Sequence, residues 1–373
     1  MVGWSFKATP PDAPFKLIFY SRLLFFHCYF ATVSMRLKNL IYGFVLLLAM
    51  WAVWKYRQQD MQVQRLEGNT MATTYHIAYF DSQKRNFQFS VDSLLKIVNQ
   101  SINTYDSTSE ISQFNRARRS FVFRLPFFLP PLKKSLQVVT GSQGAFDPTV
   151  MPLVNAWGFG SKKVERPDTA EILAIRSFVG FEKISFNNDS IWKSDPRVQI
   201  DFGAIGQGYG TDVIADFFKS KSIDNFFIEL GGEGVASGKN LAQDRWWEIG
   251  ILDPQSDYVE QKFKATATLK NEGFSTSGNY FNFREVDGKR YSHTIDPVSG
   301  FPIQRELLSA TVFASDCATA DAWATAFMSM GHERGIEIAR DHPEIAVFFI
   351  YSGIGGISTY ASENLKGDLR IEP

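Results

Sequence analysis

Cysteine and histidine are scarce in this chain. Of its 373 residues, two are cysteine, Cys28 and Cys317, and five are histidine. Two cysteines are too few for a disulfide framework, and they do not indicate a redox compartment. No Cys-x-x-Cys pair and no Cys/His spacing typical of a zinc site occurs in the sequence. The sequence therefore predicts neither a disulfide-stabilised nor a zinc-centred fold.

The chain also lacks an excess of either charge. Its 39 basic residues balance 39 acidic ones, and the only dense basic cluster is the short segment 116–119. A chain without a basic field attracts phosphate backbones weakly, so nucleic acid is not expected as a partner. A hydrophobic content of 45% over this length is typical of an ordered globular protein with a substantial core.

No apolar run reaches the length of about 20 residues that a spanning helix usually needs. The longest candidate, Leu40–Trp54, is uncharged, contains tryptophans and is bounded on both sides by basic residues. Such flanks can extend a short segment to membrane thickness. No Ala-x-Ala site follows, and no cysteine is placed for lipid attachment. We therefore predict a signal anchor over residues 38–57, with a cleaved signal peptide as the alternative.

Residues 1–34 precede this segment and do not resemble a folded unit. They are rich in aromatic residues and end directly before Met35. One hypothesis is that translation starts at Met35 and that the upstream stretch is a mis-assigned extension. N-terminal protein sequencing decides between the two starts.

From about residue 62 onward, short apolar segments alternate with turns, and no linker or internal repeat divides residues 62–373. Some predicted strands follow each other directly, and others are separated by helices. This order predicts one catalytic unit of the α+β class with a mixed sheet, rather than a doubly wound parallel sheet. The predicted helices cover residues 90–103, 130–141, 168–179, 207–220, 317–330 and 332–340. The predicted strands cover residues 71–79, 198–202, 225–230, 246–252, 263–269, 291–295, 309–314 and 345–351.

An alanine-rich helix is expected at Cys317–Phe327, with a carboxylate, Asp321, and a hydroxyl, Thr325, one turn apart. Residues at i and i+4 share a helix face. The small neighbours leave both oxygens accessible, and a hard cation such as Mg²⁺ prefers oxygen ligands. The alternative is that the alanines only favour a helix, that Asp321 complements the helix dipole and that Thr325 bonds to a carbonyl. These residues alone leave both interpretations open.

Several glycine-rich segments follow predicted strands. In Asp201–Asp212 a strand is expected to pass through a glycine loop into an amphipathic helix, an arrangement that suits phosphate binding at a helix N-terminus. The pattern matches neither the Walker loop nor the dinucleotide fingerprint. Gly144–Thr149, Glu229–Gly234 and Ser275–Tyr280 also suit a ligand site, but tight turns explain them equally well.

Tyr291–Gly300 contains His293 and Asp296 near a strand end. An isolated histidine is usually structural. Here a neighbouring carboxylate can orient the imidazole, whose titration near neutral pH suits a general base.

Taken in order, these segments resemble the ApbE family of FAD:protein FMN transferases, over roughly residues 62–335. The matching segments are Met71–Thr73, Tyr105–Asn115, Gly144–Thr149, Asp201–Asp212, the Gly231-Gly232 turn, Ser275–Gly278, His293–Gly300, and Asp321 with Thr325.

The resemblance implies an exported or membrane-tethered α+β enzyme that uses FAD as its substrate together with Mg²⁺. It implies cleavage of the FAD diphosphate, attachment of FMN through a phosphoester to a threonine hydroxyl, and release of AMP. The implied partners are FAD, the membrane, and an acceptor protein with a threonine flavinylation motif, such as a subunit of an electron-transfer complex. The implied location is the periplasmic face of the inner membrane, with the catalytic domain outside the cytoplasm.

The resemblance also implies roles for individual residues. The FAD contacts would be Met71 and Tyr105 beside the flavin or adenine, Ala145, Phe146 and Asp147 along the site, Asp201 and Gln207 at the polar part, and Thr294 against FAD. The backbone carbonyl of Ala204, with Asp321 and Thr325, would hold Mg²⁺. His293 would be the base that activates the threonine hydroxyl, with Asp296 as its orienter or as the alternative base.

The sequence departs from the family at two points. Gln207 stands where the family usually has lysine, so a neutral amide replaces a positive charge. The predicted anchor replaces the lipid-modified cysteine of many members. Two other functions stay open: an FAD diphosphatase that yields FMN and AMP, with water as the acceptor, and a flavin-binding module without catalysis.

Overall fold

The computed structural model describes residues 35–59, 62–159, 168–256, 261–279, 283–286, 289–292, 294–303 and 305–372. The chain divides into two units, Met1–Asp60 and Met61–Pro373. The prediction about residues 1–34 lies outside the described residues.

In the first unit, α2 (Met35–Gln59) is a single helix. Its segment Leu37–Lys55 is long and apolar enough to cross a membrane, a property that signal sequences near an N-terminus share. The helix therefore agrees with the apolar segment predicted over 38–57 and does not separate an anchor from a signal peptide.

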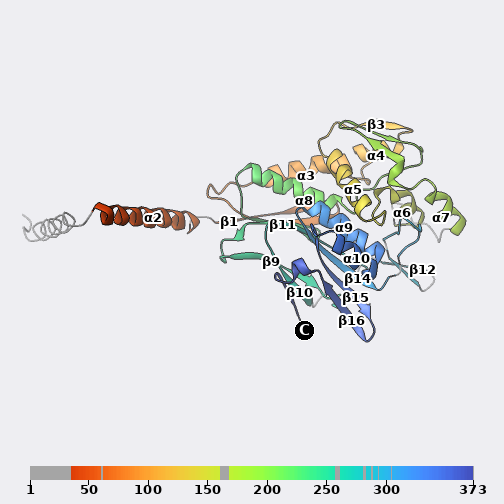
Figure 1. Ribbon diagram of the computed structural model, residues 1–373. Coiled ribbons are helices and arrows are strands. Elements are labelled where there is room, and N and C mark those ends of the chain that lie inside the picture. Colours follow the sequence, from red (N-terminus) through yellow and green to blue (C-terminus); the bar gives the residue numbers. More distant parts are fainter. Residues whose placement is uncertain are drawn as a thin grey trace, which may run out of the picture. The chain divides into compact units, whose positions relative to one another are not determined.

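An eight-stranded sheet forms the centre of the second unit, in the order β1-β2-β6-β7-β11-β14-β15-β16 (Figure 1). Its strands are β1 (Val63–Thr70), β2 (Thr73–Phe80), β6 (Phe226–Leu230), β7 (Glu233–Ser237), β11 (Glu272–Gly278), β14 (Leu307–Ala314), β15 (Ala346–Gly353) and β16 (Gly356–Ala361).

All neighbouring strands of this sheet are antiparallel. The α+β class is confirmed, whereas the prediction of a mixed sheet is wrong for the described strands. The reason lies in the connections: between β14 and β15, the helices α9 (Cys317–Met330) and α10 (His332–Asp341) run in succession. The pair brings the chain back to the end of the sheet where β14 stopped, so β15 runs in the opposite direction.

Helices cover one face of the sheet. Helix α3 (Gln88–Ile102) packs on β1, α8 (Gly206–Ser220) on β6 and β7, α9 on β11 and β14, and α10 on β15. The other helices are α4 (Glu110–Arg116), α5 (Leu129–Gly141), α6 (Met151–Ala156) and α7 (Thr169–Arg176).

The opposite face packs on a four-stranded sheet in the order β17-β10-β9-β8, through a shared apolar core. These strands are β8 (Lys239–Asn240), β9 (Arg245–Leu252), β10 (Phe263–Leu269) and β17 (Leu369–Ile371). Two small sheets complete the unit: β3 (Ser120–Val122), β4 (Ile184–Phe186) and β5 (Ser190–Lys193), and the hairpin of β12 (Phe283–Val286) and β13 (Lys289–Ser292).

Helix α9 is buried on nearly all sides. Its alanines at 320, 322, 324 and 326 are fully shielded from solvent and belong to the main apolar core. Small side chains let this helix pack closely against β11, β14 and α8. The alanines therefore serve packing rather than access for a ligand.

Two carboxylates satisfy the first backbone N–H groups of α9. Asp316 accepts hydrogen bonds from the backbone nitrogen of Thr319 at 2.9 Å and from its hydroxyl at 2.7 Å. Asp212, from α8, accepts bonds from the backbone nitrogens of Cys317 at 2.8 Å and Ala318 at 2.9 Å. Burial, with a smaller effect from nearby Asp316, raises the pKa of Asp212 to about 7. These bonds tie α8 to the start of α9.

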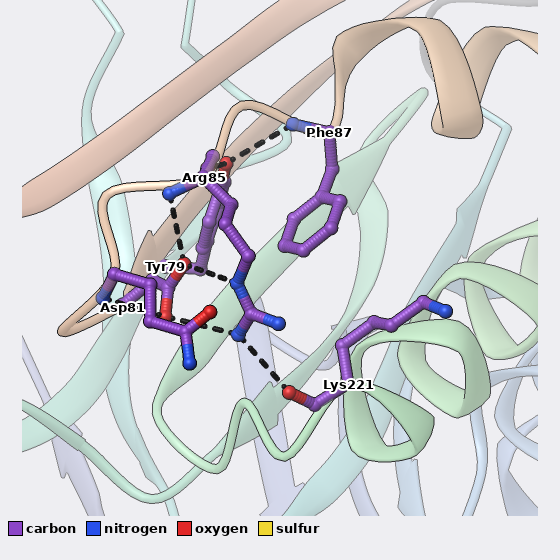
Figure 2. Close-up of polar contacts among 6 residues, drawn as sticks. Tyr79, Asp81, Arg85, Phe87 and Lys221 are labelled. Atoms are coloured by element: carbon purple, nitrogen blue, oxygen red, sulfur yellow. Dashed lines mark hydrogen bonds and ion pairs between the residues drawn. The ribbon is translucent and has the colours of Figure 1, made fainter.

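A second set of polar contacts fixes the C-terminal end of α8 (Figure 2). Asp81, directly after β2, accepts hydrogen bonds from the backbone nitrogen of Arg85 at 2.9 Å and from two nitrogens of its guanidinium at 2.8 and 3.0 Å. The same guanidinium donates to the carbonyl of Lys221, directly after α8, at 3.1 Å. Tyr79 donates its hydroxyl to the carbonyl of Arg85 at 2.6 Å. The connection from β2 to α3 is thereby joined to the end of α8.

Replacing Asp81 with asparagine should lower the free energy of unfolding at pH 7 by about 2–3 kcal/mol. The reason is that a neutral amide cannot replace the charged hydrogen bonds between the buried carboxylate and the guanidinium of Arg85. These bonds lower the pKa of Asp81. Its contribution is therefore present above the ordinary aspartate pKa of about 4 and is lost as the pH falls through the lower folded-state value. Urea unfolding at pH 7 and pH 3 measures both effects. A difference between wild type and variant that is as large at pH 3 as at pH 7 contradicts this assignment.

Candidate functional site

A cavity of about 890 Å³ opens where the start of α8, the middle of α9, the β6–β7 turn and the end of β11 meet. Ten of the predicted site residues line it: Tyr105, Ala145, Phe146, Asp147, Asp201, Ala204, Gln207, Thr294, Asp321 and Thr325. The structure thus brings together residues that are more than 200 positions apart in the sequence.

Three predicted site residues are not among the cavity lining. The side chain of Met71 lies against α8 at Gly210, and its neighbour Ala72 lines the cavity instead. Asp296 uses its carboxylate to accept a hydrogen bond from the backbone nitrogen of Val298 at 2.9 Å. His293 lies outside the described residues, so its predicted role as base stays a prediction.

The cavity depends on a close contact between α8 and α9. The backbone nitrogen of Gly208 donates a hydrogen bond to Oδ2 of Asp321 at 3.3 Å. A Cβ atom at position 208 would lie 2.6 Å from the carbonyl oxygen of Cys317 and 2.9 Å from Cβ of Asp321. Only glycine fits this approach without moving one of the helices.

Asp321 and Thr325 line the cavity from one face of α9, as predicted. Asp321 is 5% exposed, and burial raises the pKa of its carboxyl to about 7. The hydroxyl of Thr325 lies 3.3 Å from the hydroxyl of Ser277 at the end of β11. The two residues therefore present a carboxylate and a hydroxyl to the same space.

Glu233 lines the cavity as well, although no sequence pattern indicated a role for it. It is the first residue of β7, and its carboxyl lies against that of Asp321. Burial, and next the charge of Asp321, raise its pKa well above the ordinary glutamate value. The glycine pair before it signals a turn, whereas its burial arises only when α9 packs against the sheet.

The loop before α8 is fixed by a residue that does not line the cavity, Asn115. The side chain of Asn115 donates to the carbonyl of Ile200 and accepts from its backbone nitrogen, both at 2.8 Å. These bonds replace strand pairing, so the strand predicted over 198–202 is absent. Asp201 follows directly; its carboxylate accepts from the backbone nitrogen of Gly203 at 2.9 Å, and burial raises its pKa.

Asp147 lines the cavity, yet its carboxylate already has protein partners. One oxygen accepts from the backbone nitrogen and hydroxyl of Thr149 at 2.8 and 2.7 Å, and the other accepts from the backbone nitrogen of Phe181 at 2.9 Å. Burial raises the pKa of this carboxyl. Asp147 thus shapes the segment that presents Ala145 and Phe146 to the cavity.

The lining of the cavity combines two kinds of side chain. Phe146, Met151, Val154, Phe159 and Ile295 are apolar, and Tyr105 is 78% exposed. Hydroxyls and carboxylates come from β7, β11 and α9. Such a lining suits a ligand that has both a flat ring system and a polar, cation-bound group.

No lysine, arginine or histidine is found among the described residues that line the cavity. Within the same part of the chain, no cluster of three or more His, Cys, Asp or Glu side chains suits a metal ion. The lining therefore offers carboxylates, including the adjacent pair of Asp321 and Glu233, together with hydroxyls and backbone oxygens. Mg²⁺ is commonly bound in this way, through one or two carboxylates with waters and substrate phosphates as its other ligands.

Comparisons with known proteins agree with this arrangement. A model of the ApbE family matches residues 71–349. An FAD:protein FMN transferase of Vibrio cholerae serotype O1 is 36% identical over 310 residues, which cover 81% of this chain and 91% of that protein. An FAD:protein FMN transferase of Haemophilus influenzae is 34% identical over 348 residues, covering 88% and 98%.

Solved structures share the fold as well. The flavin transferase ApbE from Vibrio cholerae superposes with a TM-score of 0.75 at 34% identity, covering 83% of this chain and 99% of that one. The apo form of the Pseudomonas stutzeri flavinyl transferase ApbE gives a TM-score of 0.74 at 32% identity, covering 82% and 96%.

Replacing Gly208 with alanine should separate α8 from α9, and we expect it to lower the free energy of unfolding by about 1–3 kcal/mol and to weaken FAD binding. The control is Gly210→Ala on the same helix, whose added methyl would have its closest contact, 3.1 Å, with the flexible end of Met71 and an ordinary contact of 3.6 Å with Leu95. This control should be neutral or slightly stabilising, because alanine favours helix over glycine. Urea unfolding and flavin fluorescence titration measure the two effects; equal losses in both variants would count against the contact.

Proposed function

This chain belongs to the ApbE family and is a transferase, and we propose that it cleaves FAD and attaches FMN to a threonine hydroxyl of an acceptor protein. In this reaction the threonine oxygen forms a bond to the phosphorus of the FMN part. The bond from that phosphorus to the bridging oxygen breaks, and AMP leaves with this oxygen. The threonine proton passes to a base. The observation that carries the proposal is one cavity whose lining contains apolar side chains together with Asp321 and Thr325 of α9.

The donor set in the cavity fits Mg²⁺. Asp321 and Glu233 are buried side by side, and the Oε2 atom of Glu233 has no hydrogen-bond partner. A buried acid pair without a positive partner is costly, and a cation relieves that cost. We propose that Asp321, Thr325 and the carbonyl of Ala204 hold the ion. When bound, Mg²⁺ would neutralise charge that develops on the diphosphate.

The polar residues of the lining would bind and orient FAD. Helix α8 begins at the cavity, so the positive end of its dipole lies near these residues, although the backbone N–H groups of Gly206 and Gly208 already have acceptors in the protein. Gln207 lines the cavity at the first turn of α8 and has an amide that can donate to a phosphate oxygen. Ser277, beside Thr325, can donate its hydroxyl in the same way. These donors would hold the diphosphate for attack by the acceptor hydroxyl.

The apolar residues of the lining would bind the ring systems of FAD. Phe146 and Met151 offer flat or polarisable surfaces, and Tyr105 can stack on a ring because most of its side chain is exposed. Thr294 lines the same cavity and would lie against FAD.

For the base, the proposal remains His293, with Asp296 as its orienter or alternative. Among the described neighbours of His293, Thr294 and Ile295 line the cavity. The chain near His293 therefore reaches the site where a threonine hydroxyl would lose its proton.

The N-terminal helix supports a location of the enzyme at a membrane. We propose that α2 anchors the enzyme and that the catalytic unit works outside the cytoplasm, at the periplasmic face of the inner membrane. The acceptor would be a protein with a threonine flavinylation motif, such as a subunit of an electron-transfer complex. The apolar segment Leu37–Lys55 supports the anchor.

The test incubates the full chain in detergent with FAD, Mg²⁺ and a peptide that carries a threonine flavinylation motif. We expect the peptide to gain the mass of FMN with equimolar release of AMP, and both to cease when EDTA removes the cation. Asp321→Asn should lower kcat/KM by on the order of a hundredfold or more, because an interaction with the charged transition state is lost.

The matched control is Asp368→Asn, which removes an aspartate that pairs with Lys270 and does not line the cavity. It should transfer FMN at the wild-type rate. Release of AMP without modification of the peptide would refute the transferase assignment in favour of a diphosphatase. Binding of FAD without any AMP would indicate a flavin-binding module.

A further inference from the structure

Glu233 is aimed into the cavity by the turn that precedes it. Gly231 and Gly232 have φ angles of +67° and +100°, a conformation that favours glycine, and they connect β6 to β7 so that Leu230 pairs with Glu233. The short turn leaves Glu233 no freedom to swing its backbone away from α9. The hairpin thus sets the direction of Glu233, and the packing of α9 against β7 brings Asp321 beside it.

The carboxyl of Glu233 is buried with few partners, which are Asp321 and Ser275. The residue is 8% exposed, lines the cavity, and has an Oε2 atom without a hydrogen-bond partner. The adjacent Asp321 accepts a hydrogen bond from the backbone nitrogen of Gly208 and has a second one with the carboxyl of Glu233. Two acidic groups in contact are stabilised by a positive charge nearby.

No described side chain supplies that positive charge. The position from which a positive side chain could reach the acid pair is 207, and it holds the neutral Gln207. Its Oε1 atom lies 3.0 Å from the point where a Cβ atom of residue 231 would be, so it touches the turn before Glu233. Its neighbour Gly208 contacts Asp321. A lysine at position 207 would therefore bring an ammonium group to the acid pair, whereas the neutral amide of Gln207 does not.

We propose that Glu233 is a ligand of the divalent cation together with Asp321, and that this chain binds the cation before FAD arrives. The inference rests on the proposed function, because the cation is the Mg²⁺ that FMN transfer uses. It differs from a site that FAD phosphates must complete, since two carboxylates of the protein suffice to retain the ion. FAD would then meet a cation that is already in place.

The experiment measures binding of Mn²⁺, as a probe for Mg²⁺, to the full chain without FAD. Isothermal titration calorimetry gives the affinity, and the electron paramagnetic resonance signal of free Mn²⁺ counts the bound ions. We expect one ion per wild-type chain and an affinity at least tenfold weaker in Glu233→Gln. Gln207→Lys should weaken Mn²⁺ binding as well, because its ammonium group competes with the ion for the acid pair.

Glu229→Gln is the matched control. Glu229 belongs to the same hairpin, pairs with His76 at 2.8 Å and accepts a hydrogen bond from the backbone nitrogen of Gly232 at 2.6 Å. A glutamine there keeps an acceptor for Gly232 and removes one charge outside the cavity lining, so Mn²⁺ affinity should stay at the wild-type value. Thermal unfolding without metal shows whether each variant folds. Glu233→Gln should unfold at or above the wild-type temperature, and Mn²⁺ should stabilise it less.

Two results would overturn the inference: wild type that binds no Mn²⁺ until FAD is added, or Glu233→Gln that binds Mn²⁺ as tightly as wild type. The FMN-transfer assay separates this failure from failure of the proposed function. If wild type transfers FMN and Glu233→Gln binds Mn²⁺ with unchanged affinity, Glu233 is not a ligand and the proposed function stands. If that variant loses Mn²⁺ affinity and wild type transfers no FMN, the cation site stands and the proposed function is refuted.

Discussion

The close contact between α8 and α9 at Gly208 is the constraint on which the site depends. It brings a backbone donor of one helix to a carboxylate of the other, and no side chain larger than hydrogen fits between them. Asp212 secures the same pair of helices at the start of α9. Because α9 is buried on nearly all sides, its position is set by packing, and Asp321 and Thr325 have little freedom.

The electrostatic consequence is an acidic pocket within a neutral protein. Asp321 and Glu233 come from a helix and a hairpin that are far apart in the sequence. Burial removes most of the water that would otherwise solvate their carboxyl groups. Such a pair favours a divalent cation, and a cation in turn attracts a diphosphate. The apolar side chains of the lining add surface for a ring system. A substrate with rings joined by a diphosphate, such as FAD, suits both kinds of lining residue.

Local patterns predicted much of this molecule. The helix over 317–330 was predicted with the bounds that the structure has, because alanines favour helix and the apolar positions agree with burial. Asp321 and Thr325 were found from their spacing alone, whereas their significance came from the resemblance of the whole chain to a family. The strand predicted at 198–202 failed because the side chain of Asn115 takes the place of a neighbouring strand. Glu233 escaped notice because tertiary packing, rather than local sequence, buries it.

The central claim is that one cavity holds a cation and the diphosphate of FAD in contact. Pulsed electron paramagnetic resonance of the Mn²⁺-loaded chain tests it most directly, through the hyperfine coupling between manganese and phosphorus nuclei. The account predicts a phosphorus coupling that appears when FAD is added to wild type and is absent in Asp321→Asn. Bound Mn²⁺ and bound FAD without phosphorus coupling in wild type would contradict it.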